Sequence, residues 1–240
     1  MGEKVVGLIL NKEFKNNQGN YQSAKFIATG TLIQPQVVLT AAHCLKDTLS
    51  VSVTSEEKIP DNGQSGFVNS RKFITHPNYE NTNHRLDFGL VFLPHAIETL
   101  SEPNRFPELK SFSPEISHHY IRYGYGERGK ENRRFRAEMN YSLENKDGFV
   151  LSEDATGVYG DSGGPVFVEQ DSSFVLIGIH TGREKDSESR ELKNRSFMTP
   201  FTPAIIIWIN KMINDYRLKL AYFLINKSNF RKSLRAMQQS

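Results

Sequence analysis

Three polar side chains in this sequence have the types that nucleophilic hydrolysis requires. Ser162 lies in "GDSGGP", His43 follows the apolar run "VVLTAA", and Asp87 directly precedes "FGLVFL". A serine hydroxyl is a poor nucleophile until a base takes its proton, and a third group usually orients that base. The chain order His, Asp, Ser is one of three in which this triad geometry occurs. Each motif alone fits a structural role, but together they predict a catalytic triad.

The elements that would position these side chains are mainly β-strands. Polar stretches at 55–66, 126–136 and 182–195 read as surface loops, and no helical pattern separates the strands, so a barrel or sandwich is expected. The runs rich in β-branched and aromatic residues are 25–33, 36–42, 50–55, 88–93, 120–126, 164–170 and 173–182.

One amphipathic helix is expected from Pro203 onward, with Thr202 as its cap. Apolar residues recur there at steps of three and four from Ile205 to Leu224. Residues 209–240 carry seven Lys/Arg against one Asp, whereas residues 1–208 have a formal charge of −3. Because the basic residues gather at the C-terminus and not on the folded body, no nucleic-acid partner is expected.

Length and composition limit the possible fold size, disulfide content and location of the protein. A chain of 240 residues can bury the core of one large β-unit or two small barrels. It has no apolar run of about 20 residues and no signal-peptide pattern at its start. Cys44 is the single cysteine, so no intramolecular disulfide can form. Secretion after loss of a leader, or delivery as an effector, is favoured, and a cytoplasmic location stays open.

The motifs "LTAAHC", "DFGLVFL" and "GDSGGP" resemble the signature segments of the trypsin-like, chymotrypsin-fold serine proteases, over roughly residues 5–210. The segments "ITHPNY" and "IRYGYG" and the helix with Trp208 add to the likeness. The resemblance implies an all-β fold of two six-stranded antiparallel barrels with an extended C-terminal helix. Residues 5–105 would carry His43 and Asp87, residues 106–202 Ser162 and the specificity pocket, and residues 203–240 the helix and basic extension.

The same resemblance implies a serine endopeptidase that acts on protein or peptide substrates. A monomer is expected. Ser162 would be the nucleophile, His43 the general base and then acid, and Asp87 the group that orients the imidazole. The backbone N–H groups of Gly160 and Ser162 would form the oxyanion hole. No cofactor is expected. No metal site is expected either, because the histidines 76, 84, 95, 118 and 119 show no ligand spacing.

Specificity is expected to depend on residues outside the "GDSGGP" motif. Thr156 stands where trypsins that cut after Lys or Arg carry an aspartate, so the pocket lacks a counter-charge for a basic side chain. His180 resembles the histidine of bacterial glutamyl endopeptidases, which favours cleavage after Glu, with Asp or Gln as alternatives. A pocket-wall role for His180 without selectivity stays open, and Gly157 departs from that group's pattern. The expected substrate-binding residues are Thr156, Gly157, Tyr159, His180, Thr181 and Gly182.

A further hypothesis concerns control of activity by cleavage near the N-terminus. Val5-Val6-Gly7 resembles the new N-terminus of activated relatives, so cleavage after Lys4 would free an α-ammonium to pair with Asp161. An ordinary first strand is the alternative for this segment.

The competing functional class is a catalytically silent or zymogen-locked binding or toxin module that acts through its C-terminal extension. That basic extension could also dock on a protein partner or an acidic membrane surface.

Overall fold

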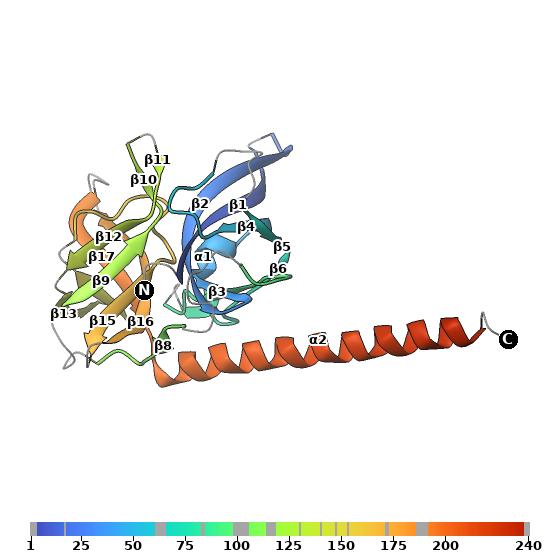
Figure 1. Ribbon diagram of the computed structural model, residues 1–240. Helices are drawn as coiled ribbons and strands as arrows, with labels where there is room; N and C mark the ends of the chain where they lie inside the picture. The colour runs from blue at the N-terminus through green and yellow to red at the C-terminus, as the bar shows by residue number, and fades with distance from the viewer. Residues whose placement is uncertain are drawn as a thin grey trace. The chain divides into compact units, whose positions relative to one another are not determined.

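The computed structural model describes residues 4–237 except 17, 61–65, 83–84, 98–105, 114–118, 130, 140, 147, 153, 171–172 and 186–191. The chain forms two compact units, Met1–Thr202 and Pro203–Ser240. The described part of the first unit holds two large, mainly antiparallel sheets, whose strands gather on opposite sides of the unit in Figure 1, and a small two-stranded sheet. The second unit consists of helix α2 (Pro203–Met237).

The first sheet closes into a barrel through one bent strand. Its order is β5-β4-β1-β2-β3-β7-β6, and only Arg71 separates β5 from β6. Since β5 pairs with β4 while β6 pairs with β7, this segment joins both edges of the sheet. Counted as one strand, the two segments leave six strands around the barrel. The bounds are β1 (Val5–Lys15), β2 (Tyr21–Gln34), β3 (Val37–Thr40), β4 (Thr48–Thr54), β5 (Val68–Ser70), β6 (Lys72–Thr75) and β7 (Gly89–Phe92).

The second sheet closes in the same way. Its order is β12-β9-β15-β16-β17-β14-β13, and β12 and β13 are separated by a single residue, so they again serve as one bent strand at both edges. The short β8 (Glu108–Leu109) adds to β16 in parallel. The remaining bounds are β9 (Tyr120–Gly124), β12 (Phe135–Met139), β13 (Tyr141–Lys146), β14 (Phe149–Ser152), β15 (Pro165–Gln170), β16 (Ser173–Lys185) and β17 (Leu192–Pro200).

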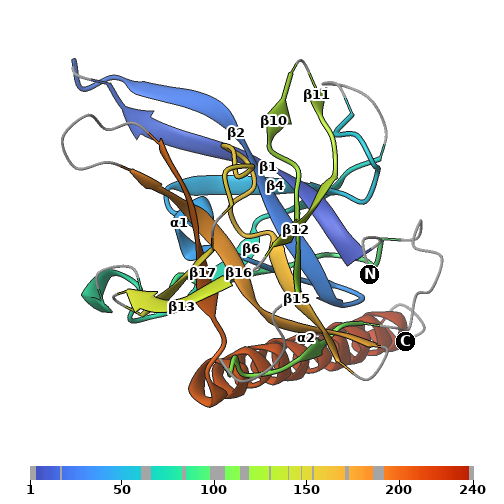
Figure 2. The same cartoon turned by 90° about the vertical axis from the view of Figure 1, so that its left-hand side faces the viewer.

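Short elements connect the strands and matter for the site. Helix α1 (Ala42–Leu45) follows β3, and a 3₁₀ turn, η2 (Glu80–Thr82), lies between β6 and β7. The strands β10 (Glu127–Arg128) and β11 (Glu131–Asn132) pair as a small hairpin. Figure 2 shows this hairpin and the connections between the strands from a second side.

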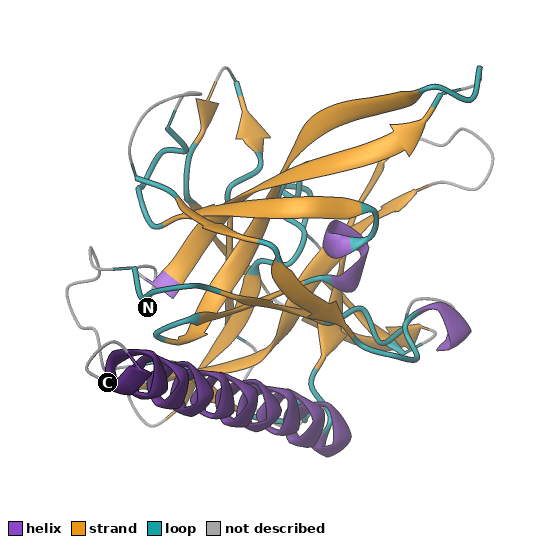
Figure 3. Ribbon diagram, turned by 90° about the vertical axis from the view of Figure 1, so that its right-hand side faces the viewer, coloured by secondary structure: helices purple, strands orange, loops and turns teal. Residues whose placement is uncertain are grey.

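Each barrel has its own apolar interior, because alternate side chains of each strand face inward. The two barrels also meet along an apolar contact in which Tyr125, just after β9, packs with Val5 and Ile9 of β1 and with Ile59. The interior of the second barrel is lined by Tyr120, Ala137, Met139, Val150, Val166, Val168, Val175, Ile177 and Met198. Figure 3 shows how strands account for most of this unit.

The expected all-β class with two barrels and a C-terminal helix is confirmed, while two of the expected loops are wrong in part. Strand β16 continues to Lys185, and β17 begins at Leu192, inside the stretch 182–195. The stretch 126–136 holds the β10–β11 hairpin and the start of β12. Pairing of these polar segments with neighbouring strands outweighs their weak strand propensity. The barrel boundary near residue 105 falls beside undescribed residues and stays a prediction.

Helix α2 is longer than the amphipathic pattern indicated, because it continues through the basic segment to Met237. Several large apolar side chains of this helix are exposed: Leu218, Tyr222, Phe223, Leu224 and Ile225. Within the described ranges, no helix combines the length and the apolar character that a membrane span requires.

Truncation of a central barrel side chain should destabilise the fold. Leu90 of β7 is 0% exposed between β3 and β6, whereas Leu49 of β4 is 55% exposed. We expect Leu90→Ala to lower the free energy of unfolding by about 2–5 kcal/mol, because the removed atoms leave a cavity. Leu49→Ala should change it by less than about 0.5 kcal/mol. Urea denaturation of both variants measures the difference, and equal losses would contradict the assigned core.

Candidate active site

His43 and Asp87 meet because β3 and β7 are paired neighbours. Thr40, the last residue of β3, lies opposite Gly89, the first residue of β7, so the residues just beyond these ends come together. His43 Nδ1 lies 2.6 Å from Asp87 Oδ2, and the His43 backbone N–H donates to Oδ1 at 2.8 Å. The Asp87 side chain is 1% exposed and that of His43 36%. With the proton on Nδ1, His43 Nε2 is left as an acceptor.

The environment of His43 favours its protonated form. Burial alone lowers the pKa of the imidazole, but the adjacent Cys44 sulfur and the Asp87 carboxylate raise it, and the net pKa is well above the ordinary value of 6.5. Cys44 is a buried free cysteine whose Sγ lies 3.5 Å from His43 Nε2. The Asp87 carboxylate therefore both orients the ring and stabilises its cation.

Ser162 lies in a tight turn that leads into β15. Gly160 and Gly163 adopt φ values of +98° and +82°, a region that side chains with a Cβ rarely enter. A Cβ on Gly163 would lie 2.1 Å from Thr40 Oγ1, so this glycine also allows the first barrel to approach the turn. Both glycines are needed for the backbone shape that presents Ser162.

Thr29 of β2 connects the first barrel to this turn. Its N–H donates to the carbonyl oxygen of Ser162 at 2.9 Å, and its hydroxyl donates to that of Gly160 at 2.7 Å. The same hydroxyl accepts a hydrogen bond from the Tyr125 N–H at 2.8 Å. The first barrel, which carries His43 and Asp87, is thereby fixed to the residues on either side of Asp161.

The turn leaves two backbone N–H groups available. Among the described residues, the N–H groups of Gly160 and Ser162 donate no hydrogen bond. The Ser162 hydroxyl donates to the carbonyl oxygen of Thr181 at 3.2 Å, and within the described part of the chain no hydrogen bond joins it to His43 Nε2. Catalytic hydrogen bonds often tighten only once substrate is bound. Transfer of the Ser162 proton to His43 therefore requires the hydroxyl to leave Thr181.

Gly157 and His180, two of the expected pocket residues, lie next to each other. A Cβ on Gly157 would lie 3.2 Å from His180 Cε1, 3.1 Å from Arg183 Cγ and 3.0 Å from Ser196 Oγ. Burial, with a smaller contribution from Arg122, lowers the pKa of His180 to about 3, so its imidazole is neutral. Its Nδ1 is buried and has no hydrogen-bond partner among the described residues.

The other expected pocket residues occupy different positions. The Thr156 hydroxyl accepts a hydrogen bond from Arg122 Nη2 at 2.9 Å. Tyr159 is 79% exposed. The Thr181 hydroxyl pairs with that of Thr199, and a Cβ on Gly182 would meet nothing within 4 Å. Their assignment to substrate binding stays a prediction.

Carboxylates close to Thr156 and Ser162 are already paired. Asp154 Oδ2 lies 2.9 Å from Arg122 Nε and 2.8 Å from Nη2, and Asp161 Oδ2 lies 2.9 Å from Arg122 Nη1. Burial raises the pKa of both carboxyl groups, but the arginine charges and hydrogen bonds outweigh it, so both pKa values are lowered. Val5, the residue proposed to pair with Asp161 after cleavage, lies in β1 opposite Thr31. That activation hypothesis stays a prediction.

Most of the chain is similar to one protein family. The Trypsin family model matches residues 11–209. The chain belongs to the trypsin family. The matched range contains His43, Asp87 and Ser162.

Individual members of the trypsin family share modest identity with this chain. Collagenase from Hypoderma lineatum is 27% identical over 167 residues, which are 62% of this chain and 63% of that protein. Trypsin from Xenopus laevis is 38% identical over 92 residues, 38% of each chain. The chain thus spans less than two thirds of the length of these relatives.

Solved structures share the fold of this trypsin-family chain. HL collagenase matches with a TM-score of 0.64 at 19% identity, covering 88% of this chain and 94% of the other. A scabies mite inactivated protease paralogue matches with a TM-score of 0.65 at 16% identity, covering 88% and 92%. At these identities the likeness establishes the chymotrypsin fold alone.

Sequence reasoning missed three residues that touch the site of this trypsin-family chain. Arg122 stands inside the apolar run "YIRYGYG", and a charge in such a strand signals a buried partner, since arginine is almost never fully buried unpaired. Arg128 lies in the polar stretch 126–136, whose composition indicates a surface loop and gives no sign of a buried partner. Cys44 directly follows His43 in the sequence, and this adjacency is the signal that its sulfur lies near the imidazole.

The His43 imidazole should titrate above pH 6.5. Folding raises its pKa, so protonation of His43 contributes stability below about pH 6.5, and that contribution is lost as pH rises through the folded pKa. Asp87→Asn should lower the titration midpoint, because the carboxylate no longer stabilises the cation. NMR titration of the ring protons measures both effects. His76, whose pKa burial lowers, is the internal control, and a wild-type His43 midpoint at or below 6.5 would contradict the assignment.

Proposed function

We propose that this trypsin-family chain is a serine endopeptidase, with Ser162 as nucleophile, His43 as general base and Asp87 as its orienting group. The observation that carries the proposal is the Asp87–His43 hydrogen bond at 2.6 Å in a site that also holds the Ser162 turn. The family membership and the two uncommitted N–H groups of that turn support it further.

The reaction follows the ordinary course of acyl transfer. Ser162 Oγ bonds to the substrate carbonyl carbon while its proton moves to His43 Nε2, and the carbonyl oxygen becomes negative. The N–H groups of Gly160 and Ser162 would stabilise that charge. The C–N bond then breaks as His43 returns the proton to the leaving amine. Water repeats the sequence on the acyl-enzyme and restores the Ser162 hydroxyl. Since His43 must be neutral to accept a proton, kcat/KM should rise with pH through its raised pKa.

We further propose a preference for an acidic residue before the scissile bond, with Glu favoured and Asp or Gln as alternatives. Asp154 and Asp161 are paired with arginines, so neither carboxylate is open to a substrate Lys or Arg. The neutral His180 imidazole offers hydrogen bonding beside Gly157. Arg183 Nη1 lies 3.4 Å from the Gly157 carbonyl oxygen and adds positive charge there.

A fluorophosphonate probe tests the catalytic assignment. We expect wild-type protein to be labelled and Ser162→Ala to remain unlabelled, because the probe bonds only to an activated serine. His43→Ala should lower the labelling rate by about 10⁴-fold or more. Ser23→Ala, at an exposed strand position, is the control and should label like wild type. Failure of the wild-type chain to react would favour the catalytically silent binding module.

A peptide-library digest tests the acidic preference. Cleavage after Glu should exceed cleavage after Lys, and His180→Val or Arg183→Ala should each reduce the ratio of Glu to Leu cleavage by about 10- to 100-fold, the value of a hydrogen bond to a charged group. Arg133→Ala, which removes an exposed guanidinium at the surface, is the matched control. Predominant cleavage after Lys or Arg would overturn the preference while leaving the triad assignment intact.

A further inference from the structure

We propose that Arg122 and Arg128 hold Asp161 in the uncut chain, so that the Ser162 turn takes its working conformation without a new N-terminus at Val5. The inference rests on the proposed endopeptidase function, since it concerns what that function requires. It makes the two arginines positioning residues, which act through Asp161 and the backbone that follows it.

The Asp161 carboxylate has no remaining capacity for another donor. Oδ1 accepts from the Gly126 N–H at 2.9 Å and from Arg128 Nη1 at 3.1 Å. Oδ2 accepts from Arg128 Nη2 at 2.5 Å, Arg122 Nη1 at 2.9 Å and the Val158 N–H at 3.1 Å. A carboxylate offers about four lone-pair sites, and five N–H groups already point at this one. An incoming α-ammonium would have to displace an arginine.

The charges around Asp161 also disfavour an added α-ammonium. The cluster contains two carboxylates, Asp154 and Asp161, and two guanidinium groups, Arg122 and Arg128, so its formal charge is zero. Arg122, Asp154 and Asp161 are buried, and Arg128 is largely covered. A fifth, positively charged group would be an uncompensated charge in this interior, which is strongly unfavourable.

The surrounding backbone also leaves no space beside the carboxylate. Cβ atoms built on Gly124 and Gly126 would lie 2.1 and 2.6 Å from Asp161 Oδ1. Val5, the first residue of the hypothetical new terminus, is buried in β1, paired with Thr31 and packed against Tyr125. To reach Asp161, Val5 would have to leave that ladder.

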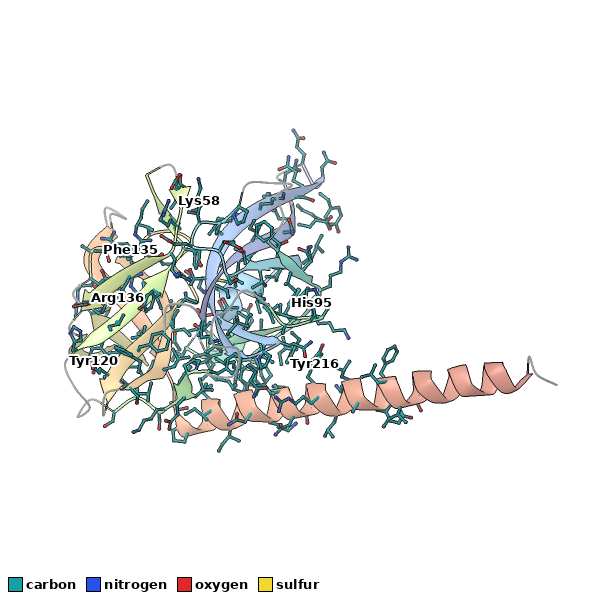
Figure 4. The ribbon with its side chains drawn as sticks, in the orientation of Figure 1. Lys58, His95, Tyr120, Phe135, Arg136 and Tyr216 are labelled. Atoms are coloured by element: carbon teal, nitrogen blue, oxygen red, sulfur yellow. The ribbon has the colours of Figure 1, made fainter. Side chains whose placement is uncertain are left out.

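The arginines fix both ends of the segment 154–161. Arg122 bridges Asp154 and Asp161 and donates to the Thr156 hydroxyl at 2.9 Å. Arg128 donates to the Thr156 carbonyl oxygen at 3.0 Å while it binds Asp161 through two N–H groups. Its guanidinium carbon lies 3.9 Å from the centre of the Phe135 ring, which Figure 4 labels on β12. The cluster thus sets the shape of the turn that presents the N–H groups of Gly160 and Ser162.

Two chains of defined N-terminus test the inference: the full chain with Met1 verified by mass spectrometry, and a chain released from a removable fusion with Val5 as its first residue. We expect fluorophosphonate labelling rates that agree within about threefold. Labelling of the Val5 chain alone would overturn the inference and leave the proposed function standing. Labelling of neither chain would overturn the proposed function, and the inference with it.

Variants of Arg128 identify the residue responsible. Arg128→Ala in the full chain should lower the labelling rate by about 10²-fold, the loss typical of a disrupted oxyanion site. Arg128→Lys should recover part of it, and millimolar guanidinium should restore Arg128→Ala in a saturable manner, which a general loss of packing would not show. Arg133→Ala, directly after the same hairpin and before β12, should label like wild type. A wild-type rate for Arg128→Ala, or no recovery by either route, would contradict the role of Arg128.

Discussion

The Ser162 turn belongs to one barrel and His43, its proposed base, to the other, so the proposed chemistry depends on the hydrogen bonds by which Thr29 connects them. Thr29 donates two hydrogen bonds to the turn carbonyls of Gly160 and Ser162 and accepts one from the Tyr125 N–H. Because both carbonyls accept from one strand position, the peptide groups 160–161 and 162–163 are fixed relative to β2. The N–H groups of Gly160 and Ser162 belong to the peptide groups directly before these two, so their orientation is restrained as well. Fixed donors are what makes an oxyanion hole effective.

Buried charge is the second constraint, and it links the turn to selectivity. Asp161 directly precedes Ser162, the proposed nucleophile, and Asp154 lies two residues before the expected pocket residue Thr156. An unpaired carboxylate in either place would be costly, and Arg122 satisfies both at once. The same pairing that stabilises the two buried carboxylates also neutralises their negative charge close to Gly157 and His180. Arg122 therefore both pairs the buried carboxylates and supports the proposed acidic preference.

The sequence predicted the parts of the structure that local patterns encode. The apolar runs before His43 and after Asp87 predicted strands β3 and β7, and the glycines of "GDSGGP" predicted a tight turn with two outward N–H groups. It could not predict the partners of buried charges, because Arg122 is 32 residues from Asp154 and 39 from Asp161 and meets them only through the fold. The length of β16 and β17 was missed for the same reason, since their polar ends are stabilised by each other and not by strand propensity.

The contacts of the His43 imidazole determine how strong a base it is. Its imidazole is held by Asp87 at the junction of β3 and β7, while its other nitrogen lies beside Cys44. Burial disfavours the imidazolium, and the neighbouring groups favour it more strongly, so the ring is a stronger base than a histidine in water. A stronger base accepts the Ser162 proton more readily, but it is neutral over a narrower range of pH. The barrel that positions His43 therefore also sets the range of pH in which it can act.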